Sequence, residues 1–216
     1  MLAPGYDYHW ILEGYEADPS LTARIEFAVI TSPYPGVHDI NVTKVKPLKT
    51  IVGQNYTCCV NVTVLNEGAF TETFNVTLYA NTTAIENKTV TLQSGNSTVL
   101  TFRWNTTGWV KGNYTIKAIA DTVPGETDTA DNTRVDGWVF VGLVGDVNAD
   151  GIVDIEDIYL VSLAYGSLYN TTDGQYWHPT PCAICPHSPN LDINWDVIID
   201  IEDIYVTALH YGEIDP

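Results

Sequence analysis

An acidic loop that leads into an apolar helical pattern occurs twice near the C-terminus of this 216-residue chain. Aligned without a gap, residues 146–166 and 192–212 are identical at 13 of 21 positions. In both copies, side-chain oxygens fall at loop positions 1, 3, 5, 9 and 12, the spacing with which a single loop surrounds a calcium ion. Four carboxylates in one short loop repel each other unless a cation lies among them. The sequence therefore predicts two calcium sites.

The expected ligands are equivalent in the two loops, and a backbone carbonyl of isoleucine serves at position 7. They are Asp146, Asn148, Asp150, Ile152, Asp154 and Asp157 in the first loop, and Asp192, Asn194, Asp196, Ile198, Asp200 and Asp203 in the second. Glycine at position 6 eases the sharp turn of such a loop. Because Gly151 occupies this position in the first loop and Val197 in the second, we expect the second site to be weaker.

Each loop leads directly into a helical pattern, and no helical pattern precedes it. Residues 155–165 and 201–211 have helical spacing, with Ile158, Val161 and Tyr165 on one stripe of the first segment. A calcium loop with an exiting helix, present twice, resembles a dockerin domain over residues 143–216, with an insertion at 167–190. The resemblance implies a small calcium-dependent docking module, whose usual partner is a cohesin domain.

Residues 37–142 contain short segments that alternate apolar and polar residues between polar turns. The inward-facing sets expected from this alternation are Tyr56, Cys58, Val60, Val62 and Val64; Phe74, Val76 and Leu78; Val90 and Leu92; Leu100 and Phe102; Tyr114, Ile116 and Ala118; and Trp138 and Phe140. About seven such strands predict an immunoglobulin-like β-sandwich. The expected fold class is mainly β with a small α part: this sandwich plus a dockerin-like pair of calcium loop–helix repeats.

The sandwich segment also resembles a CARDB domain, an adhesion-related module of prokaryotic surface proteins. The similarity lies in the sequence Asp-Ile-Asn-Val at 39–42, in Asn-Val-Thr-Val-Leu-Asn-Glu-Gly at 61–68 and in the acidic residues of 120–132. It implies a surface module without catalytic activity. The acidic residues Glu126, Asp128 and Asp131 could hold a further calcium ion, but we expect a solvated acidic turn.

Asn-x-Ser/Thr sequons are far more frequent than this composition gives by chance. The ten sites are Asn41, Asn55, Asn61, Asn75, Asn81, Asn87, Asn96, Asn105, Asn113 and Asn170. Their number predicts N-glycosylation and an extracellular location at the cell surface. Combined with the CARDB resemblance, dense N-glycosylation points to an archaeal cell surface.

The four cysteines fit an extracellular protein and allow three disulfide pairings. Cys58 and Cys59 are adjacent, and strand alternation directs Cys58 inward and Cys59 outward. Cys182 and Cys185 form a Cys-x-x-Cys motif, in which we expect a disulfide that closes the inter-repeat loop. A zinc site is the alternative, and its ligands would be His178, Cys182, Cys185 and His187.

The N-terminal segment 1–36 belongs to neither domain. Residues 24–31 alternate as a strand that must pair with some sheet. Two interpretations stay open: the segment folds back on its own chain, or it donates this strand to a neighbouring subunit. Residues 1–5 lack the basic start and apolar run of a secretion signal, so we expect a mature piece or a fragment.

Composition and motifs exclude several classes of function. A net charge of −18 excludes a nucleic-acid role, because no basic patch is present to neutralise phosphate. No apolar run reaches the length of a membrane span, and no catalytic motif stands out. We expect a non-catalytic, calcium-binding, N-glycosylated extracellular protein, a subunit of a cell-surface filament or layer held by contacts with copies of itself. The alternative is a docking or adhesion fragment of a larger secreted protein that binds a cohesin-like scaffold.

Overall fold

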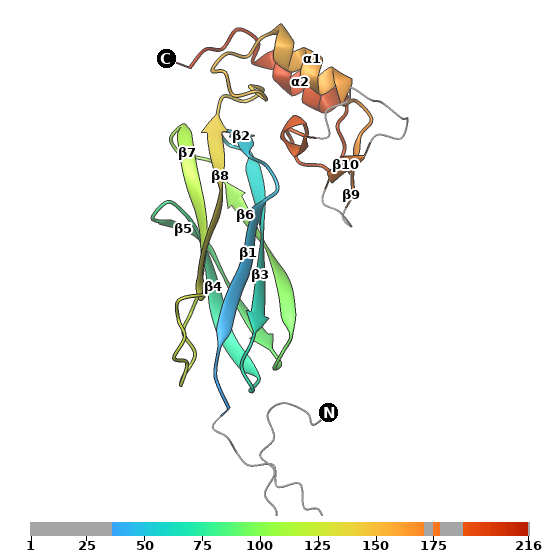
Figure 1. Ribbon diagram of the computed structural model, residues 1–216. Helices are drawn as coiled ribbons and strands as arrows, with labels where there is room; N and C mark the ends of the chain where they lie inside the picture. Colours follow the sequence, from blue (N-terminus) through green and yellow to red (C-terminus); the bar gives the residue numbers. More distant parts are fainter. Residues whose placement is uncertain (1–35, 171–174, 178–187, 216) are drawn as a thin grey trace, which may run out of the picture. The chain divides into compact units, whose positions relative to one another are not determined.

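The computed structural model describes residues 36–170, 175–177 and 188–215 (Figure 1). Contacts between residues divide the chain into a unit of residues 1–36 and a compact unit of residues 37–216. The second unit begins with the strands β1 (Ile40–Pro47), β2 (Ile51–Gly53), β3 (Thr57–Asn66), β4 (Glu72–Ala80), β5 (Thr83–Leu92), β6 (Ser97–Asn105), β7 (Gly112–Ala120) and β8 (Thr133–Gly142). It continues with α1 (Ile155–Leu163), β9 (Leu168–Asn170), β10 (Gln175–Trp177), the 3-10 helix η1 (Pro189–Leu191) and α2 (Ile201–Leu209).

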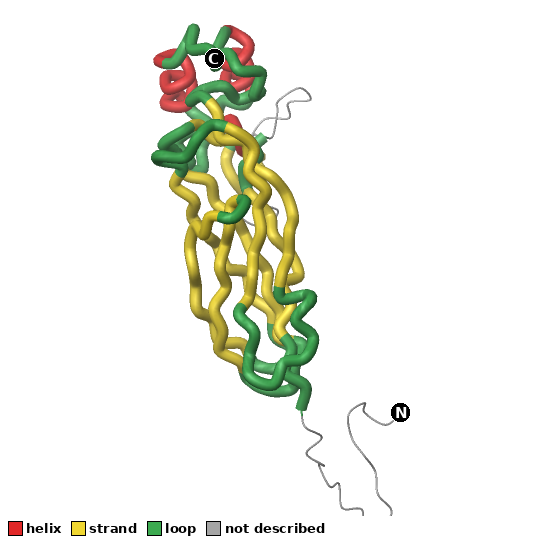
Figure 2. The backbone as a smooth tube through the Cα atoms, turned by 90° about the vertical axis from the view of Figure 1, so that its left-hand side faces the viewer, coloured by secondary structure: helices red, strands yellow, loops and turns green. Residues whose placement is uncertain are grey.

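Strands β1 to β8 form two facing sheets (Figure 2). One sheet has the order β1-β3-β6, and the other has the order β2-β8-β7-β4-β5. Neighbouring strands are antiparallel except β2 and β8, which pair in parallel from Ile51 opposite Phe140. The predicted mainly-β sandwich is confirmed. Residues 37–142 contain eight strands, where about seven were expected, because the short strand β2 adds one.

The sandwich core follows the predicted period of two. Val60, Val62 and Val64 of β3 are fully buried, and Asn61 between them is only half-buried. Trp104 lies within the same core and meets the ring of Trp109 edge-on at 4.9 Å between centroids. Alternation places one side of each strand against the opposite sheet, so burial of apolar area follows directly from the sequence pattern.

The predicted inward phase of β8 was wrong. Val139 and Val141 are fully buried, whereas Trp138 is 52% exposed. The pairing of β7 with β8 shifts register between Thr115 and Lys117, and Gly137 has a φ of 87° at this irregularity. The irregularity precedes residues 138–141, which are apolar in both phases, so alternation alone could not decide which side of the strand faces the core.

Helices α1 and α2 begin at the residues expected from the sequence. Each is capped by an aspartate of its loop: Asp154 accepts a hydrogen bond from the backbone N–H of Glu156, and Asp200 from that of Glu202. The helices end at 163 and 209, two residues earlier than expected. Tyr165, predicted on the stripe of Val161, is therefore exposed, while Val161 itself is buried.

After each helix, the chain returns to the loop of the other repeat. Ile199 exchanges backbone hydrogen bonds with Gly166 (2.7 Å) and Ser167 (2.9 Å), beyond the end of α1. Val153 makes the equivalent pair with Gly212 (2.8 Å) and Glu213 (2.9 Å), beyond the end of α2. The two loop–helix repeats are thus tied to each other, and α1 and α2 lie side by side (Figures 1 and 2).

Candidate calcium-binding module

The first acidic loop is shaped by hydrogen bonds to its own predicted ligands. The Asp146 carboxylate accepts the backbone N–H groups of Asp150 (3.2 Å) and Gly151 (3.0 Å). The Asn148 amide oxygen also accepts the N–H of Asp150, at 3.0 Å, and Asp150 accepts that of Ile152, at 2.9 Å. The side chains at positions 1, 3 and 5 are therefore held within one tight turn.

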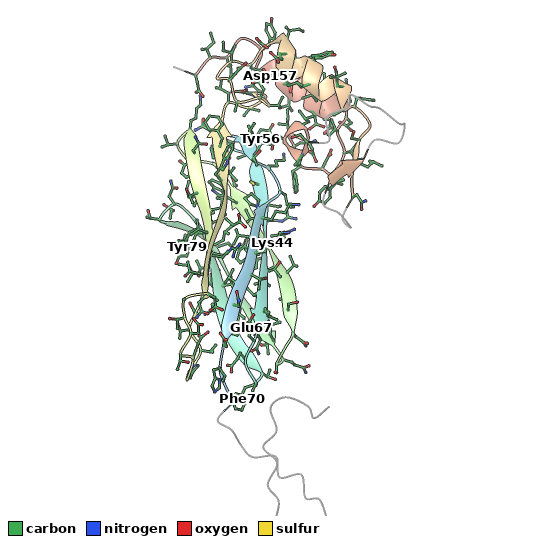
Figure 3. The ribbon with its side chains drawn as sticks, in the orientation of Figure 1. Lys44, Tyr56, Glu67, Phe70, Tyr79 and Asp157 are labelled. Carbon is green, nitrogen blue, oxygen red and sulfur yellow. The ribbon has the colours of Figure 1, made fainter. Side chains whose placement is uncertain are left out.

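The carboxylates at positions 9 and 12 join this loop to α1. Asp154 caps the helix, and one oxygen of Asp157 accepts the N–H of Asp154 at 2.9 Å. The other oxygen of Asp157 accepts the N–H of Val147, also at 2.9 Å. Asp157 is fully buried at the start of α1 (Figure 3). One side chain thus connects position 2, position 9 and the first turn of the helix.

The second loop repeats these bonds at equivalent positions. Asp192 accepts the N–H groups of Asp196 (3.3 Å) and Val197 (3.0 Å), and in addition that of Trp195 (2.6 Å). Asp203 accepts those of Ile193 (2.7 Å) and Asp200 (2.9 Å). Asn194 and Asp196 fill positions 3 and 5 as in the first loop, accepting the N–H groups of 196 (3.1 Å) and 198 (3.0 Å).

The two loops have the same backbone conformation at position 6 but different residues there. Gly151 has a φ of 90°, and Val197 has a φ of 74° in the same left-handed region. A β-branched side chain is strained there, whereas glycine is not. The second loop consequently adopts its turn at a cost in free energy that the first loop avoids, which agrees with the expected order of affinity.

Burial disfavours the charged form of two of these carboxyl groups. It raises the pKa of Asp203 to about 6, against the opposing effect of the N–H groups of Asp200 and Ile193, and the charge of Asp192 raises it further. Burial is also the main cause that raises the pKa of Asp146. A divalent cation bound beside these carboxyl groups would stabilise their charged form.

The donor set fits calcium by chemistry and position. Oxygen ligands at 1, 3, 5, 7, 9 and 12, carried by a preformed turn, are what this ion requires. Within the described residues, however, no three or more His, Cys, Asp or Glu side chains gather as a formed metal centre. The carboxylates accept backbone N–H groups, and each keeps further lone pairs with which it could bind an ion.

The second loop also contacts the sandwich through Lys49, which sequence reasoning missed. Lys49 follows β1 and is only 2% exposed. Its amino group donates hydrogen bonds to the backbone carbonyls of Asp192 and Ile193 and lies 4.9 Å from the ring centroid of Trp195. Burial lowers the pKa of Lys49, and Asp192 partly offsets this effect. A lysine between two strands carries no local signal of burial, so only the tertiary contact reveals it.

The predicted exposure of Cys59 was wrong for the same reason. Cys58 points into the sandwich core as expected, and burial raises its pKa to about 12. Cys59 lies outside that core cluster, yet it is only 4% exposed. Burial raises the pKa of its thiol, and Trp195 of the second loop is among the neighbouring groups that oppose this shift. Both thiols are free, so the adjacent pair forms no disulfide.

The outer faces of the two helices carry matching apolar side chains. Ile155 and Tyr159 of α1 are 66% and 55% exposed, and their equivalents Ile201 and Tyr205 of α2 are each 61% exposed. Large apolar side chains in equivalent exposed positions are unusual for a surface that faces only water. Each pair forms a candidate contact surface, and we call the two pairs together the paired helix face.

Acidic residues also gather near the start of β1, close to Glu67 (Figure 3). Glu126 accepts hydrogen bonds from the N–H of Ile40 (2.8 Å) and from the Asn132 amide (3.0 Å). Burial, followed by the charge of Asp131, raises the pKa of Asp39. The predicted solvated turn therefore describes exposed Asp128 but not Glu126, which is bonded to the backbone.

All ten sequon asparagines lie in the described part of the chain, and none of them is buried. Six are exposed and four are half-buried; Asn61 and Asn75 lie in the outward phase of β3 and β4, as expected. A glycan at each of these positions would extend from the surface without displacing the core. N-glycosylation stays a prediction that the geometry allows.

Several predicted sites lie outside the described residues. These are the candidate disulfide or zinc ligands His178, Cys182, Cys185 and His187, and the candidate donated strand 24–31. The inter-repeat segment is described at β9 and β10, which pair as a hairpin between Leu168 and Trp177. Among the described helices, none has the length and apolar character needed to cross a bilayer.

Comparison with known proteins identifies the sandwich. Residues 38–135 match the CARDB family model, so this part of the chain is a CARDB domain. CARDB is a non-catalytic domain family, and its members occur in cell-surface proteins. Among curated proteins, none matches the chain.

Solved structures match the same region. The CARDB domain of a Pyrococcus furiosus protein in complex with di-metal ions is 32% identical, with a TM-score of 0.43, covering 50% of this chain and 96% of that one. A domain of a protein described as a cell-surface protein of Methanosarcina acetivorans is 25% identical, with a TM-score of 0.40, covering 49% and 92%. A Bifidobacterium adolescentis β-glucosidase is 18% identical, with a TM-score of 0.35, covering 50% and 18%, and this similarity carries no inference about activity.

Proposed function

We propose that residues 143–216 bind two calcium ions and form the docking module of a non-catalytic, N-glycosylated extracellular structural protein. The observation that carries the proposal is the equivalent hydrogen-bonding pattern of the two loops, in which every side chain expected to bind calcium shapes its own turn. The CARDB domain supports a location at the cell surface. Calcium would be held by the side chains at positions 1, 3, 5, 9 and 12 and by the carbonyls of Ile152 and Ile198.

Calcium would stabilise a module whose own apolar core is small. Its apolar cluster consists of small and medium side chains, with Val161, Ala164 and Ile199 fully buried. A core of this size stabilises a domain only weakly, and small domains commonly depend on a metal. Because the ligands are poorly placed in the unfolded chain, the binding free energy would appear as folding free energy.

The paired helix face supports a protein as the partner. Its Tyr and Ile side chains are among the residue types that form the buried centres of protein interfaces. We propose that the partner is another copy of this chain, in a filament or surface layer that calcium stabilises. A cohesin-like scaffold is the alternative partner, in which case the chain is a docking fragment of a larger secreted protein.

Calcium titration by calorimetry tests the ligand assignment. We expect two ions per wild-type chain, and one ion each in Asp150→Ala and Asp196→Ala, because each substitution removes a position-5 carboxylate. Asp136→Ala, which removes an exposed carboxylate of the sandwich, serves as the control and should bind two. Two undiminished sites in either loop variant would overturn the assignment.

Sedimentation of the glycosylated protein tests the proposed partner. We expect assembly in calcium and dissociation in chelator, and we expect the double variant Tyr159→Ser/Tyr205→Ser to remain monomeric in both, because it removes the aromatic centre of the paired helix face. The control is Val110→Ser, which changes a 75% exposed residue of the sandwich. Wild-type monomers in both conditions would contradict self-assembly and favour the cohesin-like scaffold.

A further inference from the structure

Lys49 of the sandwich contacts the second loop at three of its residues. The buried amino group of Lys49 donates to the carbonyls of Asp192 and Ile193, which are loop positions 1 and 2. The same amino group lies over the ring of Trp195 at position 4. These contacts join residues separated by more than a hundred positions in the sequence, so they form only when the module is docked on the sandwich.

A second tether lies beside the first. The side-chain oxygen of Asn190, just before the loop, accepts the N–H groups of Thr50 (2.9 Å) and Ile51 (3.1 Å). Its amide nitrogen donates to the Thr50 hydroxyl at 3.1 Å. Lys49 and the two residues that follow it therefore bind the start of the loop with both backbone and side-chain groups.

We propose that Lys49 is a positioning residue for the second calcium site, so that calcium binding there and docking of the module on the sandwich are one linked equilibrium. This inference rests on the proposed function. Asp192 supplies both the carbonyl that Lys49 holds and the carboxylate that accepts Trp195 and Val197 N–H groups. Fixing that backbone fixes the position-1 ligand, in the loop that carries the strained Val197.

Two effects of Lys49 on calcium affinity have opposite signs. Positioning raises the affinity, because the loop is held in the conformation that binds. Positive charge close to a divalent cation lowers it. Positioning is the larger effect, because the Lys49 amino group donates buried hydrogen bonds to two carbonyls of the loop. The calcium affinity of the second site should therefore fall when the amino group is removed. Linkage requires that calcium strengthens docking by the same factor.

The test is Lys49→Met, which keeps the length of the side chain and removes its amino group. Its matched control is Lys46→Met, at an exposed position of β1. Calorimetry reports the affinity of each calcium site. Alkylation of Cys59 by iodoacetamide reports docking, because this thiol is 4% exposed outside the sandwich core cluster and lies near Trp195 of the second loop. Fragment-ion mass spectrometry separates it from Cys58 in the sandwich core.

We expect Lys49→Met to weaken one of the two calcium sites about tenfold, within the usual range of coupling between sites, and to leave the other unchanged. Alkylation of Cys59 should accelerate by a comparable factor, while Cys58 stays protected. Lys46→Met should match the wild type in both measurements. If Lys49→Met also exposes Cys58, the sandwich has unfolded, and Asn190→Ala, which removes the second tether, must then show the same selective loss.

Unchanged or tighter calcium binding in Lys49→Met, with Cys59 protected as in the wild type, would overturn the role of Lys49 and leave the proposed function standing. Where Lys49→Met unfolds the sandwich, the same holds if neither site weakens in Asn190→Ala. Absence of calcium binding by the wild-type protein would instead overturn the proposed function, and with it the linkage. The two failures are therefore distinguishable in one set of titrations.

Discussion

Removing calcium should unfold residues 143–216 and leave the sandwich folded. The two parts have separate apolar clusters, one around the strands and one around α1 and α2, although half-buried Tyr56 contacts both (Figure 3). At a free calcium concentration about a thousandfold above the dissociation constant, each bound ion contributes roughly 4 kcal/mol to the free energy of unfolding. Loss of two such contributions exceeds what the small cluster of the module can replace.

Circular dichroism melts with calcium and with chelator measure this effect. We expect the chelated protein to lose helical signal at low temperature and to keep the β-sheet transition of the sandwich. Restoring calcium should restore the helices, whereas magnesium, which prefers a smaller octahedral site, should do so less well. A single transition that chelation does not change would contradict the proposed role of calcium.

Asp203→Ala should have the largest effect of any single substitution in the module. Asp203 is fully buried and accepts the N–H groups of Ile193 and Asp200, in addition to its expected role as a calcium ligand. Each buried N–H left without an acceptor costs about 1–3 kcal/mol. The loss of the second calcium ion adds to that cost. We expect the free energy of unfolding of the module in calcium to fall by at least about 3 kcal/mol.

Urea unfolding of Asp203→Ala, followed through the helical signal, measures the loss. Asp203→Asn retains one oxygen acceptor and should lose less stability, although it also loses the ligand charge. Glu156→Gln changes an exposed carboxylate in the first turn of α1 and serves as the control, with little expected change. Equal stability of Asp203→Ala and the control would show that position 12 does not organise the second loop.

The two acidic loops and most of the sandwich could be predicted from the sequence, because their determinants are local. Each loop is built from hydrogen bonds that span two to ten residues, and the aspartates at positions 9 and 12 cap the helix that follows. Strand faces follow from the period of two, as Val60, Val62 and Val64 show. The loops, the starts of both helices and the core of β3 were therefore found correctly.

Bulges and strand pairing are less local, and here prediction failed in part. The inward phase of β8 begins only after the irregularity at Gly137, in residues 138–141, which are apolar in both phases. Alternation could therefore not decide between the two phases. Strand β2 is too short for its residues to show an alternating pattern. It pairs with β8, about ninety residues away in the sequence, so local sequence does not reveal it.

The sequence by itself determined the two acidic loops, their helices and the sandwich, since neighbouring residues provide the hydrogen bonds and the alternation that form them. Only the tertiary structure decided where the loops sit on the sandwich. Buried Lys49 donates to the carbonyl of Asp192, and buried Cys59 lies near Trp195, in both cases more than a hundred residues away. Contacts at that separation leave no periodic or spacing signal in the sequence, because they arise only when two independently patterned surfaces come together.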